Sequence, residues 1–169
     1  MDFHLGEKVV YPNHGVGTIE QISTRNFSGE SESYYLLKIQ SNSLRVMVPF
    51  GNAESVGLRR VSKCREVNTI LQFMEKIGCE TASNWKWRYK ENCDKMRTGE
   101  LQHVAEVLKC LLTLNQGKAL SFREKKMLER SWQLLAEEIA TARNTTREDA
   151  EVIVANAVLK ANLKPVLIN

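Results

Sequence analysis

Hydrophobic and polar residues alternate along the first sixty residues of the chain, which is the period expected of β-strands. Residues 16–22 alternate apolar with polar or small side chains, as a half-buried strand does. Other apolar runs end at Pro12 and Pro49, and polar residues separate the runs. Strands this short leave unpaired edges in an open sheet, so we predict a small barrel. The predicted strands are 8–11, 16–22, 34–39 and 44–48, with polar turns at 27–31 and 40–43.

From about residue 61 the apolar positions recur with the 3.6-residue period of an α-helix. The first predicted helix has one apolar face, and Gly78 is suited to end it in the left-handed conformation. The second predicted helix follows the N-cap candidates at 82–84 and runs to about residue 97. The apolar face of the first helix consists of Val67, Ile70, Leu71, Met74 and Ile77.

Apolar stripes predict three further helices, in the regions 101–112, 122–139 and 147–158. Capping-box spacing opens the last two, from Ser121 to Glu124 and from Thr145 to Glu148. Trp132 lies on the longest of these helices, and we expect it in the core. The sequence therefore predicts an α+β fold of two domains. These are a small β-barrel at 1–60 and a compact bundle of about five α-helices at 61–169.

The composition excludes several classes of protein. Apolar residues make up 43% of the chain, but no stretch reaches the roughly 18 apolar residues that span a bilayer. The first residues lack the basic and apolar regions of a signal peptide, so we expect a cytoplasmic protein without a membrane partner. The four cysteines include no C-x-x-C pair and the three histidines are scattered, so we expect free thiols and no metal site.

Charge is distributed unevenly between the two predicted domains. Residues 1–60 contain six basic and six acidic residues, whereas the remainder contains 18 basic and 14 acidic residues. The whole net charge of +4 therefore belongs to the helical part. This asymmetry favours a protein-binding first domain and a phosphate-binding second domain.

The stretch from Asn84 to Lys90 has the sequence NWKWRYK, with three aromatic residues and three cations. Rings are costly to expose and cations are costly to bury, so this mixture is unusual in a core. Cations bind phosphates, while flat rings stack on bases or wedge between base steps. The alternative is the start of an amphipathic helix, with one or two rings packed inward and the cations in solvent.

No arrangement of catalytic residues is evident. The G-x-G of Gly15 and Gly17 has no third glycine, and the chain contains no P-loop, no H-E-x-x-H and no G-x-S-x-G. We therefore expect neither an enzyme, nor a cofactor, nor a small-molecule substrate.

Several segments resemble the CarD/CdnL family of bacterial RNA polymerase-binding transcription regulators. The opening GEKVVYPNHG at 6–15 is similar to the family's first signature, and VMVP at 46–49 and VGLR at 56–59 continue the match. In the helical part, NW at 84–85, RYK at 88–90, AEVL at 105–108 and EKKML at 124–128 also resemble the family. The similarity spans nearly the whole chain in order. It implies a Tudor-like first domain that interacts with RNA polymerase and a helical second domain that binds DNA.

The resemblance also implies a mechanism and a set of DNA contacts. A tryptophan, here Trp85, would enter the minor groove at the upstream edge of the melted promoter and stabilise the open complex. Neighbouring cations would hold phosphates with little preference for sequence. Trp87 departs from the family pattern, where a cation is common, and either adds a stacking surface or packs inward. The expected DNA-binding residues are Trp85, Lys86, Arg88, Tyr89 and Lys90, with a second basic group at Arg123, Lys125 and Lys126.

For the polymerase, the resemblance implies a contact with its β subunit through an exposed strand edge of the first domain. The expected residues are Arg25, Leu36, Met47, Val48 and Pro49. Alternation along a strand puts Met47 on the face opposite Val46 and Val48, so at most one of these sets belongs to the core.

Two alternatives to this transcription regulator stay open. One is a protein-only adaptor that binds polymerase or another partner through the barrel, with Trp85 packed in the bundle. The other is a thiol-based sensor whose DNA or polymerase binding changes on oxidation.

Overall fold

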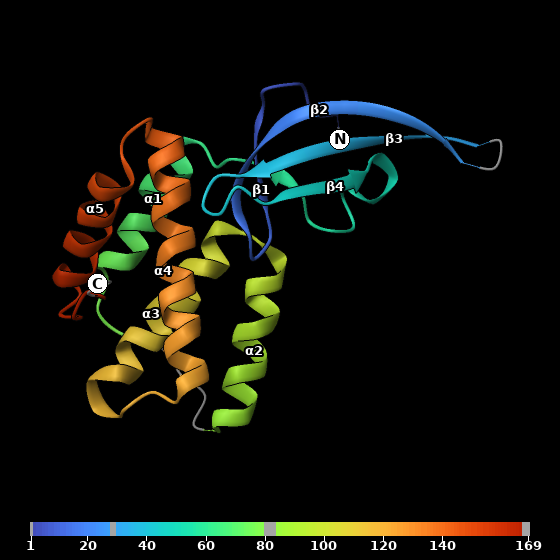
Figure 1. Cartoon of the computed structure of the whole chain (residues 1–169). Helices are drawn as coiled ribbons and strands as arrows, with labels where there is room; N and C mark the ends of the chain where they lie inside the picture. The colour runs from blue at the N-terminus through green and yellow to red at the C-terminus, as the bar shows by residue number, and fades with distance from the viewer. Residues whose placement is uncertain (1, 28–29, 80–83, 167–169) are drawn as a thin grey trace. The chain divides into compact units, whose positions relative to one another are not determined.

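The computed structural model describes residues 2–27, 30–79 and 84–166. The chain divides into two compact units, Met1–Val61 and Ser62–Asn169, each with its own hydrophobic core. The first contains strands and the second contains helices, which confirms the predicted α+β fold (Figure 1).

The first unit is a five-stranded antiparallel sheet with the strand order β4-β3-β2-β1-β5. A single turn of 3₁₀-helix, Phe50–Asn52, follows β4. The strands are β1 (Lys8–Tyr11), β2 (Gly15–Phe27), β3 (Glu30–Ile39), β4 (Arg45–Pro49) and β5 (Arg59–Arg60).

Strands β2 and β3 are longer than the sequence pattern predicts, and they reach into the segment that we predicted as a turn at 27–31. Apart from Gly15 and Phe27 the added residues are polar, and β2 and β3 pair with each other along this length. The hydroxyls of Thr24 and Ser33, for example, lie 3.0 Å apart across the pair. Backbone pairing between neighbours thus extends the strands beyond the part whose side chains are buried. Residues 28 and 29 of the predicted turn lie outside the described residues.

One face of the sheet forms the core of the first unit. The ring of Tyr35 lies at its centre, with Phe3 edge-on at 5.5 Å between centroids and Phe50 stacked at 4.0 Å. Gly17 lies where β2 meets β3, and a Cβ there would lie 3.2 Å from the carbonyl oxygen of Lys38, so a larger residue would push these two strands slightly apart. The buried core residues are Phe3, Val9, Ile19, Tyr35, Leu37, Val48, Ala53 and Leu58.

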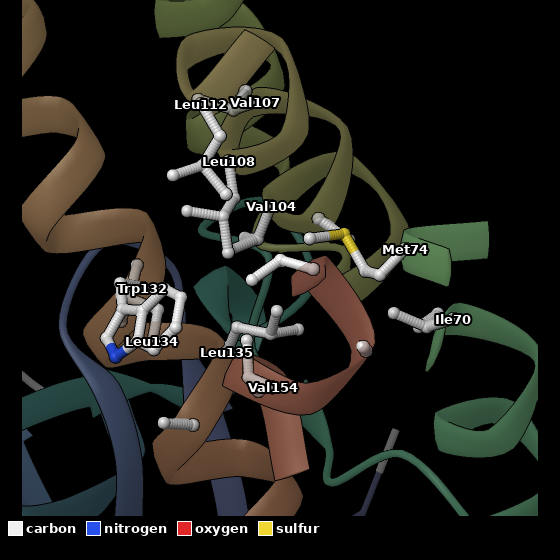
Figure 2. Close-up of a cluster of buried hydrophobic side chains, with 14 of the residues drawn as sticks. Ile70, Met74, Val104, Val107, Leu108, Leu112, Trp132, Leu134, Leu135 and Val154 are labelled. Atoms are coloured by element: carbon white, nitrogen blue, oxygen red, sulfur yellow. The ribbon is translucent and has the colours of Figure 1, made fainter. Parts of the chain in front are cut away.

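The second unit consists of five helices around one apolar core, part of which Figure 2 shows. Trp132 is 2% exposed, as expected for a core residue. The helices are α1 (Cys64–Glu75), α2 (Trp85–Thr98), α3 (Leu101–Gly117), α4 (Phe122–Arg143) and α5 (Arg147–Lys160).

The prediction for the end of α1 is wrong. The helix ends at Glu75, and Ile77, which we placed on its apolar face, is 75% exposed. The carbonyl of Phe73 accepts hydrogen bonds from the backbone N–H of Lys76 and from Nζ of Lys109. These donors satisfy a carbonyl of the last turn, so the helix can end before the residue that we predicted.

The other helix ends agree more closely with their signals. Ser121 and Glu124 form the predicted capping box of α4. At α5 the cap is Thr146, one residue later than predicted, because its hydroxyl accepts a hydrogen bond from the backbone N–H of Asp149. Asp149 takes the place we gave to Glu148.

Candidate nucleic-acid and protein interfaces

The start of α2 presents two tryptophans to solvent. Asn84 caps the helix, since its Oδ1 accepts a hydrogen bond from the backbone N–H of Lys86 at 3.0 Å. Trp85 immediately follows the cap and Trp87 lies two residues further on; they are 61% and 66% exposed. The ammonium groups of Lys86 and Lys90 lie 5.7 Å and 5.6 Å from the Trp85 and Trp87 rings. Both rings therefore point outward with a cation beside each. Of the two alternatives for Trp87, an added stacking surface and inward packing, the structure has the exposed ring.

Arg88 differs from the other cations of this stretch. It is 7% exposed, and its Nη2 donates to Oε1 of Glu124 at 2.9 Å. A guanidinium that is buried against a carboxylate does not reach a phosphate in this conformation. In place of the phosphate contact that we predicted, Arg88 joins α2 to the first turn of α4 because residue 88 lies on the inward face of α2.

The environment of Glu124 keeps this pair ionised. Burial raises the pKa of the Glu124 carboxyl, but hydrogen bonds from Arg88 and from the backbone and hydroxyl of Ser121 outweigh burial. The pKa of Glu124 is therefore lowered. The same carboxylate thus closes the capping box of α4 and holds α2 in place.

This ion pair brings the start of α4 beside α2. Phe122 is 76% exposed there, and Nζ of Lys126 lies 5.8 Å from its ring. Arg123 and Lys125 are also exposed. Tyr89 is half-buried, and a hydrogen bond with Cys93 raises its pKa, while the nearby Arg123 lowers it. We call the following residues the aromatic–basic surface: Trp85, Lys86, Trp87, Lys90, Phe122, Arg123, Lys125 and Lys126.

Phe122 is the member of this surface that sequence reasoning missed. We took the apolar residues of α4 to face the core, and Phe122 lies one position after the Ser121 cap. The usable signal was the basic run that follows it, because Arg123, Lys125 and Lys126 all lie within four positions after Phe122.

The residues predicted to contact polymerase fall on both faces of the sheet. Leu36 lies opposite Met47 across β3 and β4, and Met47 is 41% exposed. Leu36 also lies opposite Gln21 in β2, and alternation carries this outer face along β2 to the exposed Arg25. Pro49 shares the face two residues beyond Met47. We call Arg25, Leu36, Met47 and Pro49 the outer-face group.

Val48 does not belong to this group, contrary to our prediction. It is 2% exposed and lies opposite the buried Tyr35 in the core. Strand alternation turns its side chain away from Met47 and Pro49, so this side chain is not available to a partner.

The backbone of β4 lies at an edge of the sheet. The backbone N–H of Ile39 donates to the carbonyl of Leu44, which makes these opposed residues a hydrogen-bonded pair. Hydrogen-bonded and non-hydrogen-bonded pairs alternate in an antiparallel ladder, so Val46 is bonded to β3 while Met47 is not. The N–H and C=O of Met47 therefore point to the open edge, where another strand can pair with them.

The described residues contain no group of three or more His, Cys, Asp or Glu side chains placed to bind a metal. Among the helices described, none is long and apolar enough to cross a membrane.

Comparisons with known proteins match both units. The family described as "CarD-like/TRCF RID domain" matches residues 3–62, and "CarD, C-terminal domain" matches residues 69–155. A Bacillus subtilis (strain 168) protein named "Putative transcription factor YdeB" is 34% identical over 146 residues, 86% of this chain and 95% of its own. The solved structure "CdnLNt" from Myxococcus xanthus is 39% identical and covers 36% of this chain and 86% of its own, with a TM-score of 0.31. The Tudor-like first unit and the helical second unit are thus those of a transcription regulator, and the chain belongs to the CarD family.

Proposed function

We propose that this protein binds the β subunit of RNA polymerase through its first unit and promoter DNA through its second, and thereby stabilises the open complex. The observation that carries the proposal is the pair of exposed tryptophans at the capped start of α2, each with a lysine beside it. Exposed rings of this size are kept where they meet a partner.

Trp85 is the proposed wedge. It is the first residue of α2, so its ring projects from the helix end, where a narrow groove can receive it. Unstacking a base step costs a few kcal/mol, and a stacked ring returns roughly 1–3 kcal/mol. A net gain of about 1.4 kcal/mol changes the ratio of open to closed complex tenfold. At the edge of a melted promoter the bases are already open, so the unstacking cost is largely avoided and the roughly 1–3 kcal/mol returned by one ring is enough to affect initiation.

The cations of the aromatic–basic surface hold the phosphates on either side of the wedge. Lys86 and Lys90 lie one helical turn apart on α2, while Arg123, Lys125 and Lys126 extend the surface along α4. Contacts to phosphates fix the position of the protein without reading the bases, so the binding should show little sequence preference. Arg88 supports this surface from beneath through Glu124.

On the polymerase side, the open edge of β4 pairs with a strand of the β subunit. The backbone of Met47 supplies the hydrogen bonds, and the outer-face group supplies the side-chain contacts. This division of roles agrees with the charge distribution, since the first unit has no net charge.

The adaptor alternative required Trp85 to pack inside the bundle. The 61% exposure of Trp85 and its absence from the described core favour the DNA-binding role instead.

The lifetime of the open complex tests this proposal. We would measure it on a ribosomal-type promoter with cognate polymerase, comparing no factor, the native protein, Trp85→Ala and Trp87→Ala. The native protein should lengthen the lifetime, Trp85→Ala should return it to the level without factor, and Trp87→Ala should keep most of the effect. Both variants change exposed side chains, so the free energy of unfolding of each should lie within about 0.5 kcal/mol of the native value. Equal lifetimes with the native protein and Trp85→Ala, at equal polymerase binding, would refute the wedge.

A further inference from the structure

A cavity of about 300 Å³ lies within the helical unit, where the segment after α1 meets α2 and α3. Two thiols line it, although they are 31 positions apart in the chain. Cys79 follows α1 and is partly exposed, and Cys110 lies on α3 and is buried. The other residues that line it include Phe73, Asn92, Lys95 and Glu106.

The two thiols are in contact. Cys110 donates a hydrogen bond to the sulfur of Cys79, and Cys110 is also hydrogen-bonded to the side chain of Asn92 on α2. The spacing of the four cysteines along the chain gave no sign of this pair. The fold creates it by placing the end of α1 against α3.

Two lysines lie near the partly exposed thiol of Cys79. The buried Nζ of Lys109 donates to the carbonyl of Phe73 at 2.7 Å and lies 4.3 Å from the Phe73 ring. Lys95 also lines the cavity, and Glu91 and Glu106 hold it at 3.1 Å and 3.3 Å. These contacts fix two ammonium groups near Cys79, where they favour its thiolate.

The protonation of the pair is divided unequally. The hydrogen bond from Cys110, together with the cations Lys109 and Lys95, lowers the pKa of the Cys79 thiol to about 7, against the opposing effects of burial and Glu106. The same hydrogen bond, burial and the charge on Cys79 raise the pKa of Cys110. A thiol whose pKa is near ambient pH is the best attacking group in thiol chemistry. Once Cys79 is oxidised to a neutral sulfenic acid, its charge no longer raises the pKa of Cys110, and Cys110 can lose its proton and attack the sulfenic acid.

We propose that Cys79 and Cys110 form a reversible oxidation site, in which a hydroperoxide converts the two thiols to an intramolecular disulfide. The Cys79 thiolate attacks an oxygen of the hydroperoxide, the O–O bond breaks, and the departing oxygen takes up a proton as an alcohol or water. Cys79 is then a sulfenic acid. The sulfur of Cys110 attacks the sulfur of Cys79, the S–O bond breaks, and the hydroxide leaves with the thiol proton as water. The two sulfurs together lose two electrons, which the hydroperoxide gains, and a small-molecule thiol reverses the reaction.

The remaining cysteines lie in other surroundings and serve as controls. The thiol of Cys64 donates to the carbonyl of Ala142 at 3.0 Å, and Cys93 is hydrogen-bonded to Tyr89. Neither lines the cavity.

The position of the disulfide relates it to the aromatic–basic surface. Cys79 and Cys110 flank α2 in the chain, so the bond closes a covalent loop that contains the whole of α2 and Trp85. We expect the oxidised and reduced forms to differ in DNA affinity. This consequence rests on the proposed function, whereas the disulfide itself does not.

The test treats the reduced, folded protein with hydrogen peroxide and follows intact mass and cysteine-linked peptides. The native protein and Cys64→Ser should each become two hydrogens lighter, with Cys79 linked to Cys110. Cys110→Ser and Cys110→Ala should stop at a sulfenic acid on Cys79, trapped by dimedone, and Cys79→Ser should form no disulfide. Circular dichroism identifies any variant that fails to fold, and two substitutions at Cys110 guard against that loss. A native protein that forms no bond between Cys79 and Cys110, or links other cysteines instead, overturns the proposal.

Discussion

At the scale of single residues, Arg88 is distinguished from Lys86 and Lys90 by its direction. All three are cations within five positions, and the resemblance to CarD proteins treats them alike. Helical spacing separates them, because Arg88, Asn92 and Met96 recur every four residues and are the buried residues of α2. The stripe was present in the sequence, but two of its three members are polar. Hydrophobic periodicity, which detected the other helix faces, therefore did not detect this one.

The ion pair of Arg88 and Glu124 makes a prediction at this scale. Glu124→Gln keeps the side-chain oxygen of the capping box but leaves a buried guanidinium without its countercharge, so we expect about 3 kcal/mol of lost stability at pH 7. Because folding lowers the pKa of Glu124, the stability it provides is present above the ordinary value of 4.5 and is lost as pH falls through the lower folded value. Urea unfolding from pH 7 to pH 3 should show the two proteins converging.

Glu129→Gln is the matched control for that experiment. Glu129 lies on the same helix and pairs with Lys126 at 3.1 Å, but both side chains are substantially exposed. An exposed ion pair contributes little to stability, so the free energy of unfolding of this variant should lie within about 0.5 kcal/mol of the native value at every pH. A difference between native protein and Glu124→Gln that does not change with pH would contradict the ionised pair.

At the scale of secondary structure, sequence patterns located the elements better than their limits. The caps at Asn84 and Ser121 were read correctly because a side chain two or three residues from its backbone donor is a local feature. The end of α1 was misplaced because Lys109 donates a hydrogen bond to the carbonyl of Phe73 in the last turn, and Lys109 is 36 residues away from Phe73 in the chain. The lengths of β2 and β3 depend likewise on cross-strand pairing between polar residues, which has no hydrophobic signature. Where a residue distant in the sequence determines the end of a helix or strand, the local sequence pattern does not predict that end.

The cap of α2 allows stability and DNA binding to be separated. Asn84→Ala removes the acceptor for the backbone N–H of Lys86, which should cost about 1 kcal/mol and speed amide exchange in the first turn. Asn84→Asp keeps the acceptor and places a negative charge at the positive end of the helix, so it should be as stable as the native protein. The same charge lies beside Trp85 and Lys86 and should weaken DNA binding. Hydrogen exchange and fluorescence anisotropy measure the two effects, and an Asn84→Asp protein with native DNA affinity would argue against this helix start as the interface.

The β4 edge supports an equally local test of polymerase binding. Met47→Pro removes an N–H that points to the open edge, where proline is tolerated, so the fold should persist while pairing with the polymerase β subunit is lost. Val46→Pro is the control, since it removes an N–H that bonds to β3 and should destabilise the sheet. Denaturant unfolding measures the stability of each variant, and a pull-down with the polymerase β subunit measures its binding. Undiminished binding of a folded Met47→Pro protein would show that the edge backbone is not the contact.

At the scale of the whole molecule, the two units differ in charge, and the difference leads to a prediction about salt. The excess of basic residues lies in the helical unit, and five of its cations belong to the aromatic–basic surface. Each phosphate neutralised on duplex DNA adds about 0.9 to the slope of log affinity against log salt, because a counterion is released. Lys86→Gln and Lys90→Gln should therefore each weaken binding and flatten the slope by about 0.9. Trp85→Ala should weaken binding with the slope unchanged, because a ring releases no counterion.

Lys160→Gln is the control and should leave both the affinity and the slope unchanged, because Lys160 pairs with Glu75 and lies on α5, across the bundle from α2 (Figure 1). Anisotropy titrations over a range of salt concentrations distinguish these outcomes, and a Lys86→Gln protein with the native slope would remove that residue from the interface.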